Sequence, residues 1–174
     1  MTGSDGGNAA GAKQAAFAPG GVPYRRHIYK KVERYGSGME LTNIRDLFRE
    51  KEKYADQDVT VGGWVRSNRD SKTFGFLVVN DGSFFEPLQV VYSDTMADFE
   101  AVAKIGVGAA VIVTGKIVVT PGAKQPLEMQ AEAVVVEGAS PSDYPLQKKR
   151  HSFEYLRTIS HLRARTNTFQ AVFR

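Results

Sequence analysis

Two phenylalanines in the run "TFGFLVVN" (residues 73–80) have the residue type and spacing to bind a flat ligand. Strand alternation puts Phe74 and Phe76 on one face and Gly75 and Leu77 on the other. The interior of a barrel or sandwich needs only one of these faces. An outward aromatic pair would offer a stacking platform for unpaired bases, whereas an inward pair would simply be core. Alternation alone leaves both interpretations open.

Polar side chains near this run could add recognition. Gln89 alternates against Leu88 and Val90 in the run "LQVVY". Its amide offers a donor and an acceptor together, which is the combination that matches the edge of a base such as uracil. It could equally be a glutamine on the wet side of a half-buried strand. Arg66 and Arg69 follow the run "VTVGGWV" and suit phosphate or base contacts, or ordinary solvated surface.

No catalytic motif accompanies these groups. The sequence has no phosphate-binding GxxxxGK[ST] loop, no HExxH pair, no GxSxG turn and no cysteine. The three histidines lie far apart in the sequence, and no pair of carboxylates has a spacing that indicates acid and base catalysis. We therefore expect a binding function, with neither a catalytic residue nor a metal site in this chain.

Five Val-rich runs bounded by Gly, Asp, Ser and Pro predict strands, at residues 59–67, 74–80, 88–92, 109–119 and 127–136. An amphipathic pattern over 41–54 predicts a helix before them, with Thr42 as its N-cap. A shorter pattern around Phe99 and Val102 predicts a helix between the third and fourth strands. This order is typical of an OB-fold, a five-stranded Greek-key barrel that often binds oligonucleotides. The predicted fold class is all-β.

Composition and charge set the limits on function. The chain has 174 residues, 42% of them hydrophobic, and no run long enough to suggest a membrane helix. Without a secretory signal, a cytoplasmic location is expected. The net charge of +4 is uneven: residues 39–146 hold ten Lys/Arg and sixteen Asp/Glu, whereas residues 147–174 hold seven Lys/Arg and one Glu. Any nucleic-acid recognition by the acidic middle must be local.

The sequence predicts four segments. Residues 1–38 are interpreted as a disordered or fused leader, poor in large apolar groups and ending in Gly-Ser-Gly; a basic arm that touches RNA is the alternative. Residues 39–58 hold the first helix and 59–139 the barrel. Residues 140–174 form a Pro-containing hinge and the start of a further helix, with Thr166 or Thr168 as its cap. This last helix breaks off mid-pattern, which indicates a truncated larger protein.

The segment "VTVGGWVRSNRDSKTFGFLVVNDGSFFEPLQVVY" closely resembles the N-terminal anticodon-binding domain of the class II synthetases for asparagine, aspartate and lysine. The continuation from "TPGAKQPLEMQ" to the C-terminus looks specifically like bacterial asparaginyl-tRNA synthetase. The resemblance covers residues 39–174. It implies binding of the anticodon stem-loop of tRNA(Asn). The anticodons for asparagine, aspartate and lysine all have uracil at the central position.

The resemblance also assigns roles. It implies that Phe76 stacks on the central base, that Gln89 hydrogen-bonds its edge and that Arg69 supports the loop. Weaker candidates for the flanking positions are Arg66, Phe74, Lys124 and Glu128.

The class II motifs that bind ATP, asparagine and Mg²⁺ and build the family's homodimer are missing, apart from the first turns of the motif 1 helix. We therefore expect the chain to keep only tRNA recognition and to use no cofactor itself. The alternatives are an OB-fold scaffold or interaction protein without specific RNA binding, or a domain of the aspartate-type enzyme. A complete enzyme is disfavoured by the missing motifs.

Overall fold

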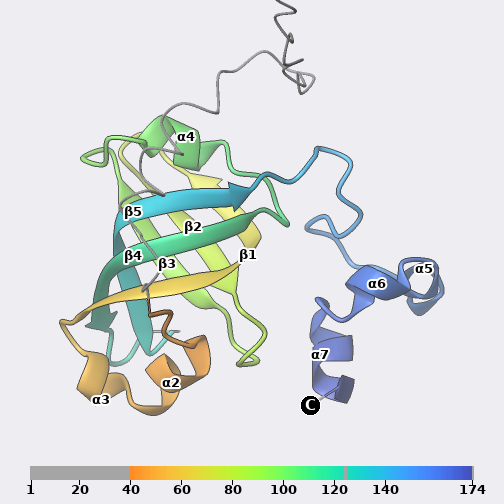
Figure 1. The fold of residues 1–174 in the computed structure, drawn as a ribbon, viewed down its shortest axis with the longest axis horizontal. Coiled ribbons are helices and arrows are strands. Elements are labelled where there is room, and N and C mark those ends of the chain that lie inside the picture. Colours follow the sequence, from red (N-terminus) through yellow and green to blue (C-terminus); the bar gives the residue numbers. More distant parts are fainter. Residues whose placement is uncertain (1–39, 124, 174) are drawn as a thin grey trace, which may run out of the picture.

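A computed structural model describes residues 40–123 and 125–173, so the interpretation of residues 1–38 lies outside the described residues. Eleven elements follow one another along the described chain (Figure 1). They are α2 (Ile44–Arg49), α3 (Lys51–Tyr54), β1 (Asp58–Asp70), β2 (Phe74–Asn80), β3 (Leu88–Ser93), α4 (Phe99–Ala103), β4 (Ala110–Val119), β5 (Leu127–Gly138), α5 (Phe153–Thr158), α6 (Ser160–Arg163) and α7 (Asn167–Phe173).

The five strands form a closed barrel in the order β1-β2-β3-β5-β4. All neighbouring strands are antiparallel except β3 and β5, which are parallel. Closure leaves the sheet without a free edge strand. The predicted all-β OB-fold barrel, with a short helix between its third and fourth strands, is confirmed. Helices α2 and α3 lie at one end of the barrel and α4 at the other (Figure 1).

The barrel core is built from alternate residues of every strand. Gly75, Leu77 and Val79 of β2 point inward, and Leu88, Val90 and Tyr92 of β3 face them. Tyr92 is only 1% exposed, and its ring passes so close to Gly75 that a side chain there would meet it. Gly75 therefore makes room for the largest buried side chain, which fixes the face of β2 that is turned inward.

The N-terminal helix differs from the prediction. One helix over 41–54 with Thr42 as its N-cap was expected, but the chain forms two short helices, and Asn43 takes the N-cap position without a side-chain bond. The first helical N–H groups are satisfied from another loop: a carboxylate oxygen of Asp81 accepts from the Ile44 N–H at 2.8 Å, and the Ser83 hydroxyl accepts from Arg45 at 3.0 Å. The β2–β3 turn therefore caps α2 in place of Thr42.

The short helix α4 is tied to the barrel by one side chain. The Asn68 amide donates to the carbonyl oxygens of Val102, Ala103 and Ile105, at 2.8, 3.2 and 3.3 Å. Its own oxygen accepts from the Tyr92 hydroxyl at 2.9 Å. Carbonyls at a helix C-terminus need such donors, so Asn68 holds α4 against β1.

Three short helices follow the barrel and lie beside it (Figure 1). Helix α7 begins at Asn167, so Thr166 precedes it, whereas Thr168 lies inside it and was a wrong choice of cap. The Thr166 hydroxyl donates to the Arg163 carbonyl at 2.6 Å. Helices α5 and α6 were not predicted.

Candidate nucleic-acid interface

The two phenylalanines of β2 lie on the outer face of the barrel. Because Gly75 and Leu77 point inward, Phe74 and Phe76 point outward, with Phe74 43% exposed and Phe76 half-buried. Their rings meet edge to face, with centroids 5.5 Å apart. The choice that strand alternation left open is thus settled, and an aromatic pair is presented on the surface.

Strand register brings the other predicted residues to the same face. Arg69 of β1 is paired with Phe76, and Gln89 of β3 is paired with Val78. Directly paired residues of antiparallel strands share a face, and Phe76 and Gln89 are diagonal neighbours, for which Cα atoms lie about 7–8 Å apart. Arg69 is exposed. Together Arg69, Phe76 and Gln89 form a strip across three strands, named the outer β1–β3 face below.

A carboxylate holds the amide of Gln89. Nε2 of Gln89 donates to Oε1 of Glu128, on the adjacent strand β5, at 2.6 Å. A carboxylate only accepts hydrogen bonds, so the nitrogen end of the amide must face Glu128. The amide keeps its carbonyl oxygen and one N–H for a ligand. Glu128 was a candidate for the flanking anticodon positions. The structure joins it to Gln89, and its role at the flanking positions stays a prediction.

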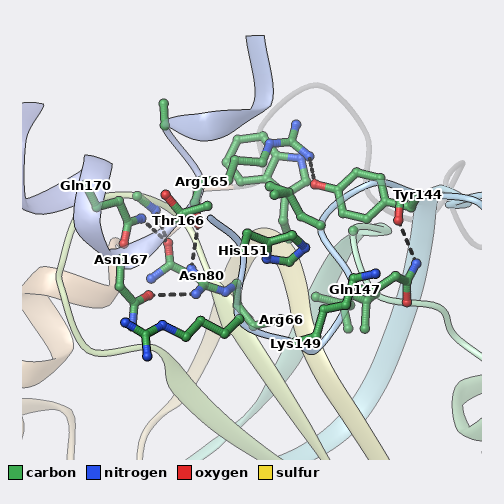
Figure 2. Close-up of a pocket in the computed structure, with 18 residues that line it drawn as sticks. Arg66, Asn80, Tyr144, Gln147, Lys149, His151, Arg165, Thr166, Asn167 and Gln170 are labelled. Carbon is green, nitrogen blue, oxygen red and sulfur yellow. Dashed lines mark hydrogen bonds between the residues drawn. The ribbon is translucent and has the colours of Figure 1, made fainter. Parts of the chain in front are cut away.

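Arg66 does not belong to this strip. It is the extra residue of a β-bulge between Val65 and Ser67. Its guanidinium donates to the Arg165 carbonyl at 2.8 Å and to Oδ1 of Asn167 at 2.6 Å (Figure 2). Burial lowers the pKa of Arg66 from its usual value. The bulge therefore turns Arg66 toward the C-terminal segment, away from the outer β1–β3 face.

The last two predicted candidates for the anticodon contacts are Phe74 and Lys124. Phe74 lies on the face beside Phe76. Lys124 lies outside the residues that the structure describes.

Trp64 is a surface residue that was not predicted from the sequence. It is 38% exposed, and the Arg165 guanidinium lies 4.6 Å from its ring centroid. The signal for it was a single tryptophan within an otherwise Val-rich strand.

The described residues hold no group of three or more His, Asp or Glu side chains arranged to bind a metal ion. Within the same residues, no helix is long and apolar enough to cross a membrane. The outer β1–β3 face itself offers stacking by aromatic rings, hydrogen bonding by an oriented amide and positive charge from Arg69.

Comparison with known proteins gives the class of this barrel. A family described as an OB-fold nucleic acid binding domain matches residues 59–137. The matched residues begin in β1 and end in β5, so they coincide with the closed barrel. The barrel is thus an OB-fold nucleic acid binding domain.

Individual relatives narrow the class. The asparagine–tRNA ligase of Bacillus cereus (strain ATCC 10987 / NRS 248) is 57% identical over 136 residues, which are 78% of this chain and 29% of the relative. That of Acetivibrio thermocellus is 56% identical over 137 residues, 78% of this chain and 30% of the relative. The crystal structure of asparaginyl-tRNA synthetase from Pyrococcus horikoshii complexed with asparaginyl-adenylate has a TM-score of 0.63 and 25% identity, covering 74% of this chain and 30% of that one.

Over the barrel and its flanking segments this chain is thus similar to one part of asparaginyl-tRNA synthetases, as the sequence predicted. The chain spans about three tenths of the length of the curated relatives it matches. The aspartyl-tRNA synthetase from Entamoeba histolytica shares the fold at 19% identity, with a TM-score of 0.64.

Proposed function

We propose that the chain recognises the anticodon loop of tRNA(Asn) through the outer β1–β3 face. The observation that carries the proposal is the position of Phe76 beside a Gln89 amide whose orientation Glu128 fixes. An outward ring provides a surface for one base, and a fixed amide beside it provides a donor and an acceptor for that base's edge.

Uracil is the base that this arrangement favours. Its edge presents an N–H donor beside carbonyl acceptors, so it complements the Gln89 carbonyl oxygen and remaining N–H. Cytosine reverses this order, with an amino donor in place of one carbonyl and a bare ring nitrogen in place of the N–H, so an amide held in one orientation meets it donor to donor and acceptor to acceptor. Arg69, paired with Phe76 across the strands, supports the loop through a phosphate or base contact. Recognition by a few oriented groups suits a barrel that lies in a segment of net negative charge, residues 39–146.

Gln89→Ala tests the base contact. Stem-loop RNAs that differ only in U or C at the centre of the loop are titrated against the chain, with Gln57→Ala as a control that removes an exposed glutamine before β1. We expect the preference of the wild-type chain for U to fall by about 1 to 3 kcal/mol in Gln89→Ala and to persist in Gln57→Ala. Equal affinities of wild type for the two loops would overturn the proposal.

Phe76→Ala tests the stacking contact separately. Stacking does not depend on the base edge, so both loops should bind more weakly by about 1 to 3 kcal/mol with the preference for U preserved. Phe85→Ala is the matched control, since Phe85 is also exposed but lies in the β2–β3 loop. A loss in Phe76→Ala no larger than in Phe85→Ala would contradict the stacking role.

The parent reaction that the family implies is ATP-dependent attachment of asparagine to tRNA, by a cytoplasmic homodimer that uses Mg²⁺. We assign no step of that reaction to the described residues. We propose that this chain contributes tRNA recognition. Aminoacylation assays on this chain, with a full-length relative as positive control, check that division, and product formed by this chain would contradict it.

A further inference from the structure

A pocket of about 590 Å³ lies between the barrel and the C-terminal segment, outside the strip of Arg69, Phe76 and Gln89. Residues of β1 and the end of β2 form one wall. Residues 144–151 and 164–170 form the other (Figure 2). The proposed anticodon contacts do not use this pocket, so its chemistry requires a separate explanation.

The lining of the pocket is positively charged. Four Lys and Arg side chains and His151 contribute to it, and no Asp or Glu does among the described residues. The four are Arg66, Lys149, Arg150 and Arg165. No ion pair between these four and a described carboxylate is present. Charges that converge without a counter-ion favour an anionic ligand.

Arg66 and Arg165 show this most clearly. Arg66 is half-buried, and its hydrogen-bond partners are a carbonyl and an amide oxygen, both neutral. Arg165 lies over the Trp64 ring and donates to the Tyr144 hydroxyl at 3.2 Å. Each guanidinium has five N–H donors, so both retain donors for a ligand. Guanidinium groups with free donors match the oxygens of a phosphate group.

A buried acceptor in the same pocket adds a second requirement. Oε1 of Gln170 is buried and has no hydrogen-bond partner among the described residues. The orientation of its amide is fixed, because Nε2 donates to Oδ1 of Asn80 at 2.9 Å, and that oxygen also accepts from the Gly82 N–H. A buried acceptor without a partner is unfavourable, and a hydroxyl of a ligand would satisfy it.

We propose that this pocket binds a ribose-phosphate unit, with the phosphate among the four cations and a sugar hydroxyl donating to Gln170. The unit comes either from the backbone of RNA or from a free nucleotide or sugar phosphate. The position of the pocket favours RNA. Asn80 follows Phe76 by four residues on β2, so the pocket begins about 13 Å along the strand from the stacking ring.

Trp64 provides a direct assay. It lines the pocket and is the single tryptophan of the chain, so the tryptophan fluorescence of the chain originates at this site. The full chain is titrated with ribose 5-phosphate in one arm and with a stem-loop RNA in the other, at constant ionic strength. We expect a saturable change in Trp64 fluorescence. A response to RNA alone identifies the backbone as the source, and a response to ribose 5-phosphate alone identifies a free phosphate compound.

Charge-matched variants separate the pocket from general electrostatics. Lys149→Gln with Arg150→Gln removes two exposed cations that line the pocket, and Lys148→Gln with Arg157→Gln removes two exposed cations that do not. We expect the midpoint of the Trp64 titration to rise at least about tenfold in the first variant and to stay near wild type in the second.

Binding in the pocket is distinguishable from binding at the proposed anticodon contacts, because Gln89→Ala should leave the Trp64 response to ribose 5-phosphate unchanged. If neither ribose 5-phosphate nor the stem-loop RNA gives a saturable response, the proposal is overturned. Equal shifts of the midpoint in the two double variants would overturn it as well.

Discussion

Glu128→Gln isolates the orientation of the Gln89 amide from its presence. In the wild-type chain the 2.6 Å bond from Nε2 to the carboxylate fixes which end of the amide faces the ligand. A glutamine at position 128 has nearly the same shape but both donates and accepts. The Gln89 amide can then turn over, so it presents the wrong end to uracil part of the time.

The expected loss of preference for U follows from the conformational freedom that the hydrogen bond to Glu128 removes from the Gln89 side chain. Immobilising one rotamer-rich side chain at an interface accounts for about 0.5 to 1.5 kcal/mol. The preference for U over C should therefore fall by a factor of about 2 to 13. Removing a negative charge beside RNA strengthens binding to both loops. The ratio of the two dissociation constants, and not either constant alone, is thus the quantity that reports orientation.

Fluorescence anisotropy with labelled stem-loops that carry U or C at the central position measures this ratio. Glu132→Gln is the matched control, since it makes the same charge change at an exposed position of the same strand. We expect Glu132→Gln to keep the wild-type ratio. A Glu128→Gln ratio equal to that of wild type would refute the orienting role of the carboxylate.

Three further predictions concern the scaffold. Asp81→Ala removes the acceptor for the Ile44 N–H and should lower the free energy of unfolding by about 0.5 to 2 kcal/mol in urea titrations, whereas an unchanged midpoint would exclude the cap. Gly75→Ala places a methyl group against the Tyr92 ring and should cost about 1 to 3 kcal/mol, and a melting temperature as high as wild type would contradict this. Burial, with a smaller contribution from Asp70, raises the pKa of Tyr92. The unfolded chain therefore loses this proton first, so stability is retained below about pH 10 and falls above it. Tyr92→Phe should flatten that fall in unfolding experiments at alkaline pH. An unchanged slope of the free energy of unfolding against pH would contradict the assignment of the fall to Tyr92.

The sequence predicted the barrel because its signals are local. Val-rich runs, turn residues and the order of elements depend on neighbours in the chain, and the strands lie close to the expected ranges. Alternation along β2 could not decide which face points inward, since that depends on Tyr92 packing against Gly75 from another strand. The cap of α2 was mispredicted for the same reason, because its acceptor Asp81 lies 37 residues from Ile44.

The candidate site was predicted in part. The resemblance named Arg69, Phe76 and Gln89, and strand register places them on one face. The bond from Gln89 to Glu128 joins residues 39 apart across the parallel pair of strands, and no local pattern indicates it. Arg66 lies on a bulge, which shifts the alternation by one residue and redirects the side chain.

We propose that the outer β1–β3 face holds the anticodon loop. Chemical-shift mapping of the isotope-labelled chain, titrated with a stem-loop that has uracil at its centre, tests it most directly. We predict the largest changes at Arg69, Phe76 and Gln89 of the three adjacent strands. Changes confined to other surfaces of the barrel, with these three residues unaffected, would contradict the claim.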